Sequence, residues 1–199
     1  MRKPITLEDH QASRWIVEPL RLLDCCLISD GGVCVIVTSP DRARHARQPT
    51  VLISGMGQGY TTQNMEHPDW WYVPHQKRAV GDAYAMAGVG PADIDVAQLY
   101  DNFTSSVLLW FEHAGFCKVG ESGAFVEGGR IQLGGELPIN TAGGNLSESY
   151  MEGWLHIVEG VQQLRGQCGE RQVAGAEVCL VTGRGQALNC ANATILKKG

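Results

Sequence analysis

Residues 138–150 read PINTAGGNLSESY, a segment rich in glycine, asparagine and serine that leads into an apolar pattern of helical spacing. A glycine-rich loop that runs into a helix can present backbone N–H groups to an anion or an oxyanion. A flexible surface turn is the alternative interpretation. This loop is the first of two segments in the chain that favour a functional site.

The second segment, residues 99–105, reads LYDNFTS and places a polar cluster where a predicted strand ends and a helix begins. The alternative interpretation is a helix cap, with Asp101 or Asn102 satisfying the free N–H groups of the first turn. Neither segment names a reaction by itself.

Around these segments, short apolar runs alternate with stretches of helical spacing, which indicates an α/β layered domain. We expect strands at residues 33–38, 50–55, 94–99, 177–182 and 191–196, with the first two buried on both faces. Helices are expected at residues 77–88, 105–115 and 150–165, and residues 6–23 are in loose helical phase. A turn through residues 183–185 is expected to join the last two strands.

We expect residues 56–74 to form a long irregular loop, and loops of that length inside a compact domain are usually functional. It contains Trp70, Trp71 and Tyr72, a candidate contact surface or acyl-chain surface. An ordinary loop anchor is the alternative.

The composition is that of a globular protein: 199 residues, 44% hydrophobic and 19% charged, with a net charge of −5. This acidic balance argues against nucleic-acid binding, which needs a basic face. We find no apolar run of the roughly 20 residues that a membrane span needs and no signal-peptide pattern at the start, so we expect a cytoplasmic protein.

Metal and cofactor motifs are also missing from the sequence. The seven cysteines show no CxxC spacing, so we expect reduced, mostly buried thiols and neither a disulfide framework nor a metal site. We find no GxGxxG, P-loop, GxSxG or HExxH motif. His156 is predicted to be a structural histidine.

Taken together, the two segments resemble the C-terminal half of a thiolase-fold protein, and in particular the thiolase-like lipid-transfer proteins related to the sterol carrier protein X thiolase. Tyr100-Asp101-Asn102-Phe103 falls where these thiolases carry Asn-Glu-Ala-Phe or His-Asp-Cys-Phe. Residues 140–144 match the Asn-x-x-Gly-Gly loop, and residues 181–185 fall on the Cys-x-Gly segment. Residues 24–37 resemble the last strand of the thiolase N-terminal domain.

The resemblance implies a thiolase-like fold in which residues 1–48 are the end of the N-terminal domain plus a linker, and residues 49–199 are the layered C-terminal domain. It also implies that ordinary thiolase chemistry is missing. The thiolase His falls on Tyr150, the first-motif Asn or His on Tyr100, and the Cys of Cys-x-Gly on Val181. The nucleophilic Cys belongs to a part of the family's N-terminal domain that is not in this sequence.

Tyrosine at both positions is the pattern of the steroid side-chain aldolases. The resemblance to them implies retro-aldol cleavage of a β-hydroxyacyl-CoA steroid side chain, giving a 17-ketosteroid and propionyl-CoA, with CoA as part of the substrate and no covalently bound cofactor. It implies Tyr100 and Tyr150 as an acid/base pair, with the division of roles open. Further candidates for the thioester or oxyanion site are Asn102, Asn140, Gly143, Gly144 and Gly183.

Two alternatives remain at this point: a non-catalytic acyl-CoA carrier or scaffolding subunit, and, less favoured, an acetyl-CoA acyltransferase. The resemblance implies as partners the complementary thiolase N-terminal half and a small OB-fold, zinc-binding protein. Because an isolated half would expose apolar faces, we expect a homo- or hetero-oligomer rather than a lone monomer.

Overall fold

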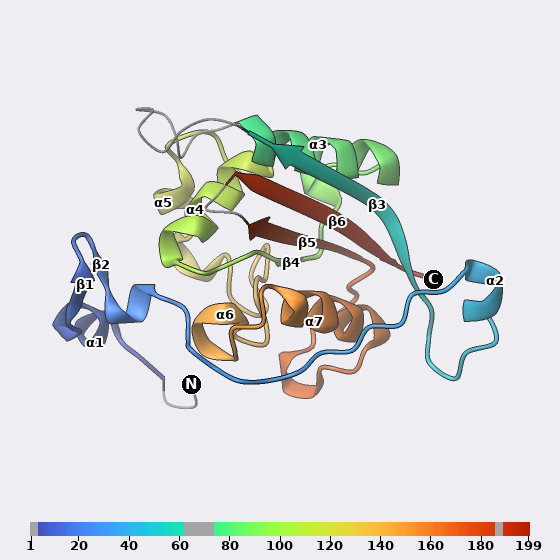
Figure 1. The fold of residues 1–199 in the computed structure, drawn as a ribbon, viewed down its shortest axis with the longest axis horizontal. Coiled ribbons are helices and arrows are strands. Elements are labelled where there is room, and N and C mark those ends of the chain that lie inside the picture. Colours follow the sequence, from blue (N-terminus) through green and yellow to red (C-terminus); the bar gives the residue numbers. More distant parts are fainter. Residues whose placement is uncertain (1–3, 62–73, 186–188) are drawn as a thin grey trace.

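A four-stranded mixed sheet forms the centre of the fold (Figure 1). In order across the sheet, its strands are β3 Val51–Tyr60, β6 Cys190–Lys198, β5 Val178–Gly185 and β4 Val96–Gln98. β6 is antiparallel to both β3 and β5, whereas β4 runs parallel to β5. The computed structural model describes residues 4–61, 74–185 and 189–199.

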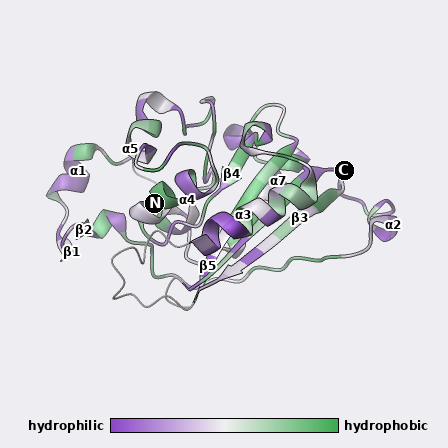
Figure 2. Cartoon of the chain, turned by 90° about the horizontal axis from the view of Figure 1, so that it is seen from above, coloured by the Kyte–Doolittle hydropathy of each residue, from purple (hydrophilic) through white to green (hydrophobic). Residues whose placement is uncertain are grey.

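Helices cover both faces of this sheet. α3 Pro74–Ala87 and α4 Thr104–His113 lie on one face, and α7 Trp154–Arg165 lies on the other (Figure 1). The strands alternate accordingly: Ala97, Leu180 and Ile195 pack with α3 and α4, while Val96, Val181 and Leu196 join the core on the α7 side. In Figure 2 the hydrophobic residues run along these strands. The predicted α/β layered class is confirmed.

β3 is longer than predicted and lies at an edge of the sheet. Leu52 and Ile53 on this strand are partly exposed, so the prediction that it is buried on both faces is wrong. The strand continues to Tyr60 because Gly55, Gly57 and Gly59 line the side that faces α3. A Cβ at any of the three would collide with helix backbone, at Ala83, Ala79 and His75 respectively. The glycines therefore let α3 lie directly on the strand.

The N-terminal segment does not form the long helix that its loose helical phase suggested. A capping box of Thr6 and Asp9 begins α1 Leu7–Ala12, which ends at the extended residue Ser13. A small hairpin of β1 Trp15–Val17 and β2 Leu20–Arg21 follows, and then a turn of 3-10 helix, η1 Leu22–Asp24. None of the residues of α1 or β1 is buried.

The strand expected at residues 33–38 is also wrong. Residues 26–39 are extended and, within the described part of the chain, pair with no strand; they pass α6 and α7 before reaching α2 Pro40–Ala43 (Figure 1). Ile36 is 87% exposed and Val37 71% exposed. The apolar run is therefore left uncovered instead of forming a buried strand.

The remaining elements are short and connect the layers. They are η2 Pro91–Asp93, α5 Ser122–Phe125, η3 Glu127–Gly129, α6 Gly144–Ser147 and η4 Gly169–Arg171. The helix expected from residue 150 begins only at Trp154, and residues 183–185 belong to β5 rather than to a turn. Trp70, Trp71 and Tyr72 lie outside the described residues.

Cysteine burial is lower than predicted. Cys168 and Cys179 are buried, but Cys34 is exposed and Cys25, Cys26, Cys117 and Cys190 are only half-buried. In the described ranges, no helix combines the length and the apolar character that crossing a membrane requires.

Candidate active site

The two segments singled out in the sequence meet at the carboxyl edge of the parallel strands β4 and β5. Tyr100 lies two residues after the end of β4, and its backbone N–H donates to the Thr182 hydroxyl on β5 at 3.0 Å. Its phenol hydroxyl lies 3.1 Å from that of Tyr150, within hydrogen-bond distance. The two candidate catalytic residues, far apart in sequence, are thus brought into contact.

Tyr100 is only 3% exposed, whereas Tyr150 is half-buried. Burial raises the pKa of Tyr100 well above its ordinary value, and the hydrogen bond with Tyr150 raises it further. Burial also raises the pKa of Tyr150, although the hydrogen bond from Tyr100 acts in the opposite direction. Both groups are therefore phenols, not phenolates, near neutral pH.

Asn140 ties the glycine-rich loop to the strand that carries Tyr100. Its side chain accepts from the Leu99 N–H at 2.7 Å and donates to the Leu99 carbonyl at 2.9 Å, like a strand partner. The residue adopts a left-handed conformation with φ 43°. The oxygen and the NH₂ group of the Asn140 side-chain amide therefore both bind the backbone of Leu99, next to Tyr100.

Asp101 organises the rest of the loop. Its carboxylate accepts from the N–H groups of Asn145 at 2.8 Å and Leu146 at 3.3 Å, at the start of α6. Gly144 lacks the Cβ that would collide with this carboxylate, and it has φ +58°. The N–H groups expected to bind an external anion are thus used by Asp101, which caps α6 and not the helix that follows it in sequence.

His156 completes this buried cluster. Its Nε2 lies 2.9 Å from Asp101 Oδ1, and both residues are 1% exposed. The ring centroids of His156 and Tyr100 are 6.4 Å apart. His156 is buried beside a carboxylate, as expected of a structural histidine, but it also lies next to the tyrosine pair.

The other candidates lie around the same edge. The Asn102 side chain accepts from the Ser106 hydroxyl at 2.7 Å, in the first turn of α4. Gly143 has φ +108° and precedes α6. Gly183 lies inside β5, where a Cβ would meet the side chain of Asn192. The α4 N-cap is Phe103, without a side-chain capping bond, so neither Asp101 nor Asn102 caps that helix.

Three features that sequence patterns did not single out also contribute. Thr182 holds the backbone of Tyr100, and Ser29 accepts from the Tyr150 N–H at 2.9 Å. On the α3 side, Arg184 is buried, and burial lowers its pKa to about 10 while the Tyr100 phenol raises it. Turned toward Arg184, the Gln76 amide oxygen accepts from its Nε at 2.7 Å and its Nη2 at 3.0 Å.

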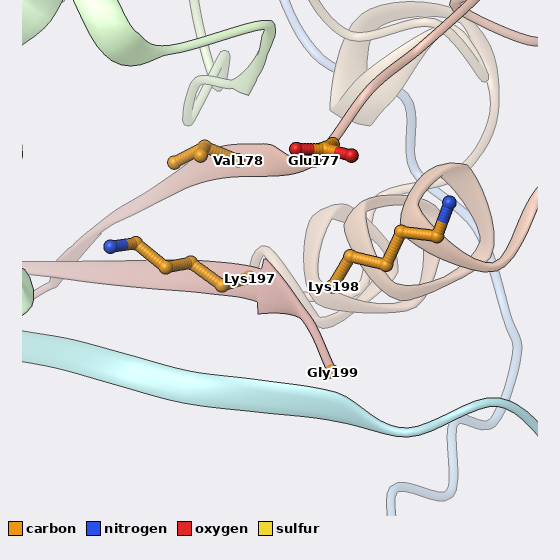
Figure 3. Close-up of a pocket in the computed structure, with 5 residues that line it drawn as sticks. All are labelled: Glu177, Val178, Lys197, Lys198 and Gly199. Carbon is orange, nitrogen blue, oxygen red and sulfur yellow. The ribbon is translucent and has the colours of Figure 1, made fainter.

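A shallow hollow lies at the other end of the sheet, lined by Glu177, Val178, Lys197, Lys198 and Gly199 (Figure 3). Lys197 already donates to the Ala87 carbonyl at 2.9 Å. In the part of the chain that the structure describes, no three His, Cys, Asp or Glu side chains gather as a metal site would require.

Comparison with known proteins identifies the family. The model of the thiolase C-terminal domain-like family matches residues 57–198, which is most of the chain. The chain belongs to this family. It is 48% identical over 185 residues to a 17-hydroxy-3-oxo-4-pregnene-20-carboxyl-CoA lyase of Mycobacterium tuberculosis, covering 90% of this chain and 48% of that one.

A second relative of this thiolase-like chain is a steroid side-chain-cleaving aldolase of Thermomonospora curvata, 46% identical over 83% of this chain and 44% of the relative. Among solved structures, the Ltp2-ChsH2(DUF35) aldolase matches with a TM-score of 0.92 and 42% identity, covering 98% of this chain and 52% of that chain. The predicted thiolase-like fold and the predicted likeness to the steroid aldolases are confirmed. The chain spans about half the length of the curated relatives it matches.

Proposed function

We propose that this thiolase-like chain takes part in retro-aldol cleavage of a β-hydroxyacyl-CoA steroid side chain, releasing a 17-ketosteroid and propionyl-CoA. The observation that carries the proposal is the 3.1 Å contact between the Tyr100 and Tyr150 hydroxyls at the carboxyl edge of the sheet. The relatives named for steroid side-chain cleavage, at 46% and 48% identity, support the same reaction class.

Two phenols suit this chemistry. The proton of the substrate's tertiary alcohol leaves, the carbon–carbon bond breaks, and its electron pair becomes a thioester enolate that then takes a proton at carbon. One phenol mediates the first proton transfer and the other supplies the second, so no covalent enzyme intermediate is needed. A phenol can also stabilise the developing enolate oxyanion by donating to it. CoA enters as part of the substrate, and no covalently bound cofactor takes part.

The remaining candidates shape the site in this proposal. Asn140, Gly143 and Gly144 hold the loop that leads to Tyr150. Asn102 lies just before α4, and Gly183 lies inside β5. We propose that the thioester group lies against this edge of the sheet.

We further propose that the complementary thiolase N-terminal half completes the protein, and that a small OB-fold, zinc-binding protein assembles with it. Residues 1–48 would then be the end of the N-terminal domain plus a linker. The uncovered apolar residues 35–37 support this assembly, because such a run is ordinarily covered by a neighbouring strand. The DUF35 component named for the matching aldolase structure supports the second partner.

The test is propionyl-CoA release by the complete assembly carrying Tyr100→Phe or Tyr150→Phe. Each change removes only a hydroxyl, and we expect turnover to fall by about 10²- to 10⁴-fold, the contribution usual for a general acid or base. Tyr84→Phe is the matched control, since Tyr84 is also a half-buried tyrosine, but its hydroxyl donates to the Ala114 carbonyl at 3.2 Å, away from the pair.

Full activity in both site variants would remove the tyrosine pair from the mechanism. Tight acyl-CoA binding by the parent protein with no product after long incubation would instead favour the non-catalytic carrier.

A further inference from the structure

Glu152 lies in a strained turn that is fixed against the tyrosine pair. With φ 52°, it is one of two non-glycine residues with positive φ in the described part of the chain, the other being Asn140. Such a conformation is strained for a residue other than glycine and persists where the surroundings impose it. The next residue, Gly153, has φ +83°, and a Cβ there would lie 3.1 Å from a ring carbon of Tyr100. The turn that carries Glu152 therefore rests on the Tyr100 ring.

The three side chains form a series from the interior to the surface. Tyr100 is buried, Tyr150 is half-buried and Glu152 is exposed. After burial and the contact between the two phenols, the negative charge of Glu152 helps to raise the pKa of Tyr100. After burial, it also raises the pKa of Tyr150. Glu152 follows Tyr150 by two residues, and the turn that carries it packs against the Tyr100 ring, so its negative charge lies near both phenols.

Retro-aldol cleavage needs such a group. A neutral phenol can accept the alcohol proton only if it gives up its own proton at the same time. Both phenols here have raised pKa values, so neither is ionised in advance. A glutamate carboxylate is ordinarily ionised at neutral pH and can accept that proton. Glu152 supplies a negatively charged group close to the two neutral phenols.

We propose that Glu152 is the proton relay of the site, a positioning residue that acts through Tyr150. This inference rests on the proposed retro-aldol function. Tyr150 takes the proton of the substrate alcohol while passing its own to the Glu152 carboxylate. The alcohol oxygen becomes the ketone, the broken carbon–carbon bond leaves its pair on the thioester enolate, and Tyr100 protonates the enolate carbon. The proton on Glu152 returns through Tyr150 to Tyr100, so the protein regains its starting state.

Other charged and titratable groups around the site do not fill this role. Cys26, on the extended segment, interacts with both phenols and with Glu152, but burial raises its pKa and it is a thiol near neutral pH. Asp101 is engaged by His156 and by α6. Arg184 interacts with Tyr100 but is a cation.

Glu148 provides a matched control. It is four residues before Glu152, but burial raises its pKa and its charged neighbours are Glu159, Arg171, His156 and Asp101. The largest influences on its pKa include neither phenol.

The experiment compares the complete assembly with its Glu152→Gln, Glu152→Asp and Glu148→Gln variants. We expect Glu152→Gln to lower kcat for propionyl-CoA release by about 10²-fold with KM within about twofold, as removal of a general base does. Glu152→Asp should recover part of the loss because it keeps the carboxylate. Glu148→Gln should leave kcat within about twofold.

A second readout does not depend on turnover. Tyrosinate absorbance is titrated with pH in the parent and in Glu152→Gln, with Tyr150→Phe identifying the Tyr150 signal. Removing the carboxylate should let the Tyr150 phenolate form at lower pH. An unchanged titration with unchanged kcat in an active assembly would overturn the relay and leave the retro-aldol proposal intact. A parent assembly that cleaves no substrate would overturn both.

Discussion

Tyr100 and Asp101 are adjacent in sequence, yet their side chains contact different groups, as expected for neighbouring residues at the end of a strand. Tyr100 reaches Tyr150, whereas Asp101 reaches His156 and the N–H groups of α6. One short segment therefore supplies a chemical group and also fixes the loop that leads to the second one.

The first prediction concerns Asp101→Asn. The amide has one oxygen to accept from Asn145 and Leu146, and its NH₂ group would face an N–H donor. We expect a loss of about 1–3 kcal/mol in the free energy of unfolding, measured by denaturant titration. Turnover should fall as well, because the loop would no longer be held against the end of β4.

Asp82→Asn is the control for that change. Asp82 is exposed on α3 and pairs with Arg78 at 3.7 Å. Its replacement should change stability by no more than about 0.5 kcal/mol. Equal effects of the two substitutions would contradict the role given to Asp101.

Sequence patterns predicted the tyrosine pair but not its surroundings. The two motifs were recognisable because their glycine and asparagine spacing matches a known family. The alternative interpretation of residues 99–105 had Asp101 or Asn102 capping the helix that follows, since capping is usually local. Asp101 instead caps α6, which tertiary contacts bring beside it, and no local pattern contains that information.

At the scale of elements, the contact of α3 with β3 depends on glycine. Gly57 lies in the middle of the strand, where a Cβ would collide with the Ala79 carbonyl. We expect Gly57→Ala to destabilise the fold by about 1–3 kcal/mol, the usual cost of overpacking a close contact. The measurement is the midpoint of urea unfolding.

Gly185→Ala is the control for Gly57→Ala, because nothing lies within 4 Å of a Cβ built at Gly185, also on a sheet strand. A midpoint for Gly57→Ala equal to that of Gly185→Ala would show that the helix can move away from the strand without cost.

The same contact explains why β3 was predicted too short. The predicted strand ends at Gly55, and glycine often weakens or interrupts strands. Here three glycines at alternate positions face one helix, a pattern that belongs to the interior of a strand when a helix backbone approaches it closely. The helices and the other sheet strands were easier to predict, because their apolar spacing follows burial on either side of the sheet.

At the scale of the whole molecule, the uncovered apolar surface is the feature to explain. The strand expected at residues 33–38 is extended but unpaired within the described ranges, and Ile36 is almost fully exposed. The β-branched residues of this run predicted a strand. The sequence did not show that, within the described ranges, the run would be left without a strand partner.

We therefore predict that Ile36→Glu weakens association with the complementary thiolase half, because a charge on a covered apolar strand costs desolvation energy. Native mass spectrometry of the protein purified gently from its source should detect that half, unless it is part of the same polypeptide, together with the zinc-binding partner. Less of the assembly should be detected with Ile36→Glu. Glu8→Gln, on the exposed helix α1, should leave the amount of assembly unchanged. Purification of the parent without either partner would contradict the proposed assembly.

The most direct test of the tyrosine mechanism is cleavage of the steroid β-hydroxyacyl-CoA by the complete assembly in D₂O, with product mass and rate measured together. Because exchangeable phenol protons reach the enolate, we predict propionyl-CoA carrying one deuterium at its α carbon, with the rate reduced at least about 10²-fold in Tyr100→Phe. Propionyl-CoA released at the parent rate by Tyr100→Phe, or released without deuterium at that carbon, would contradict the account.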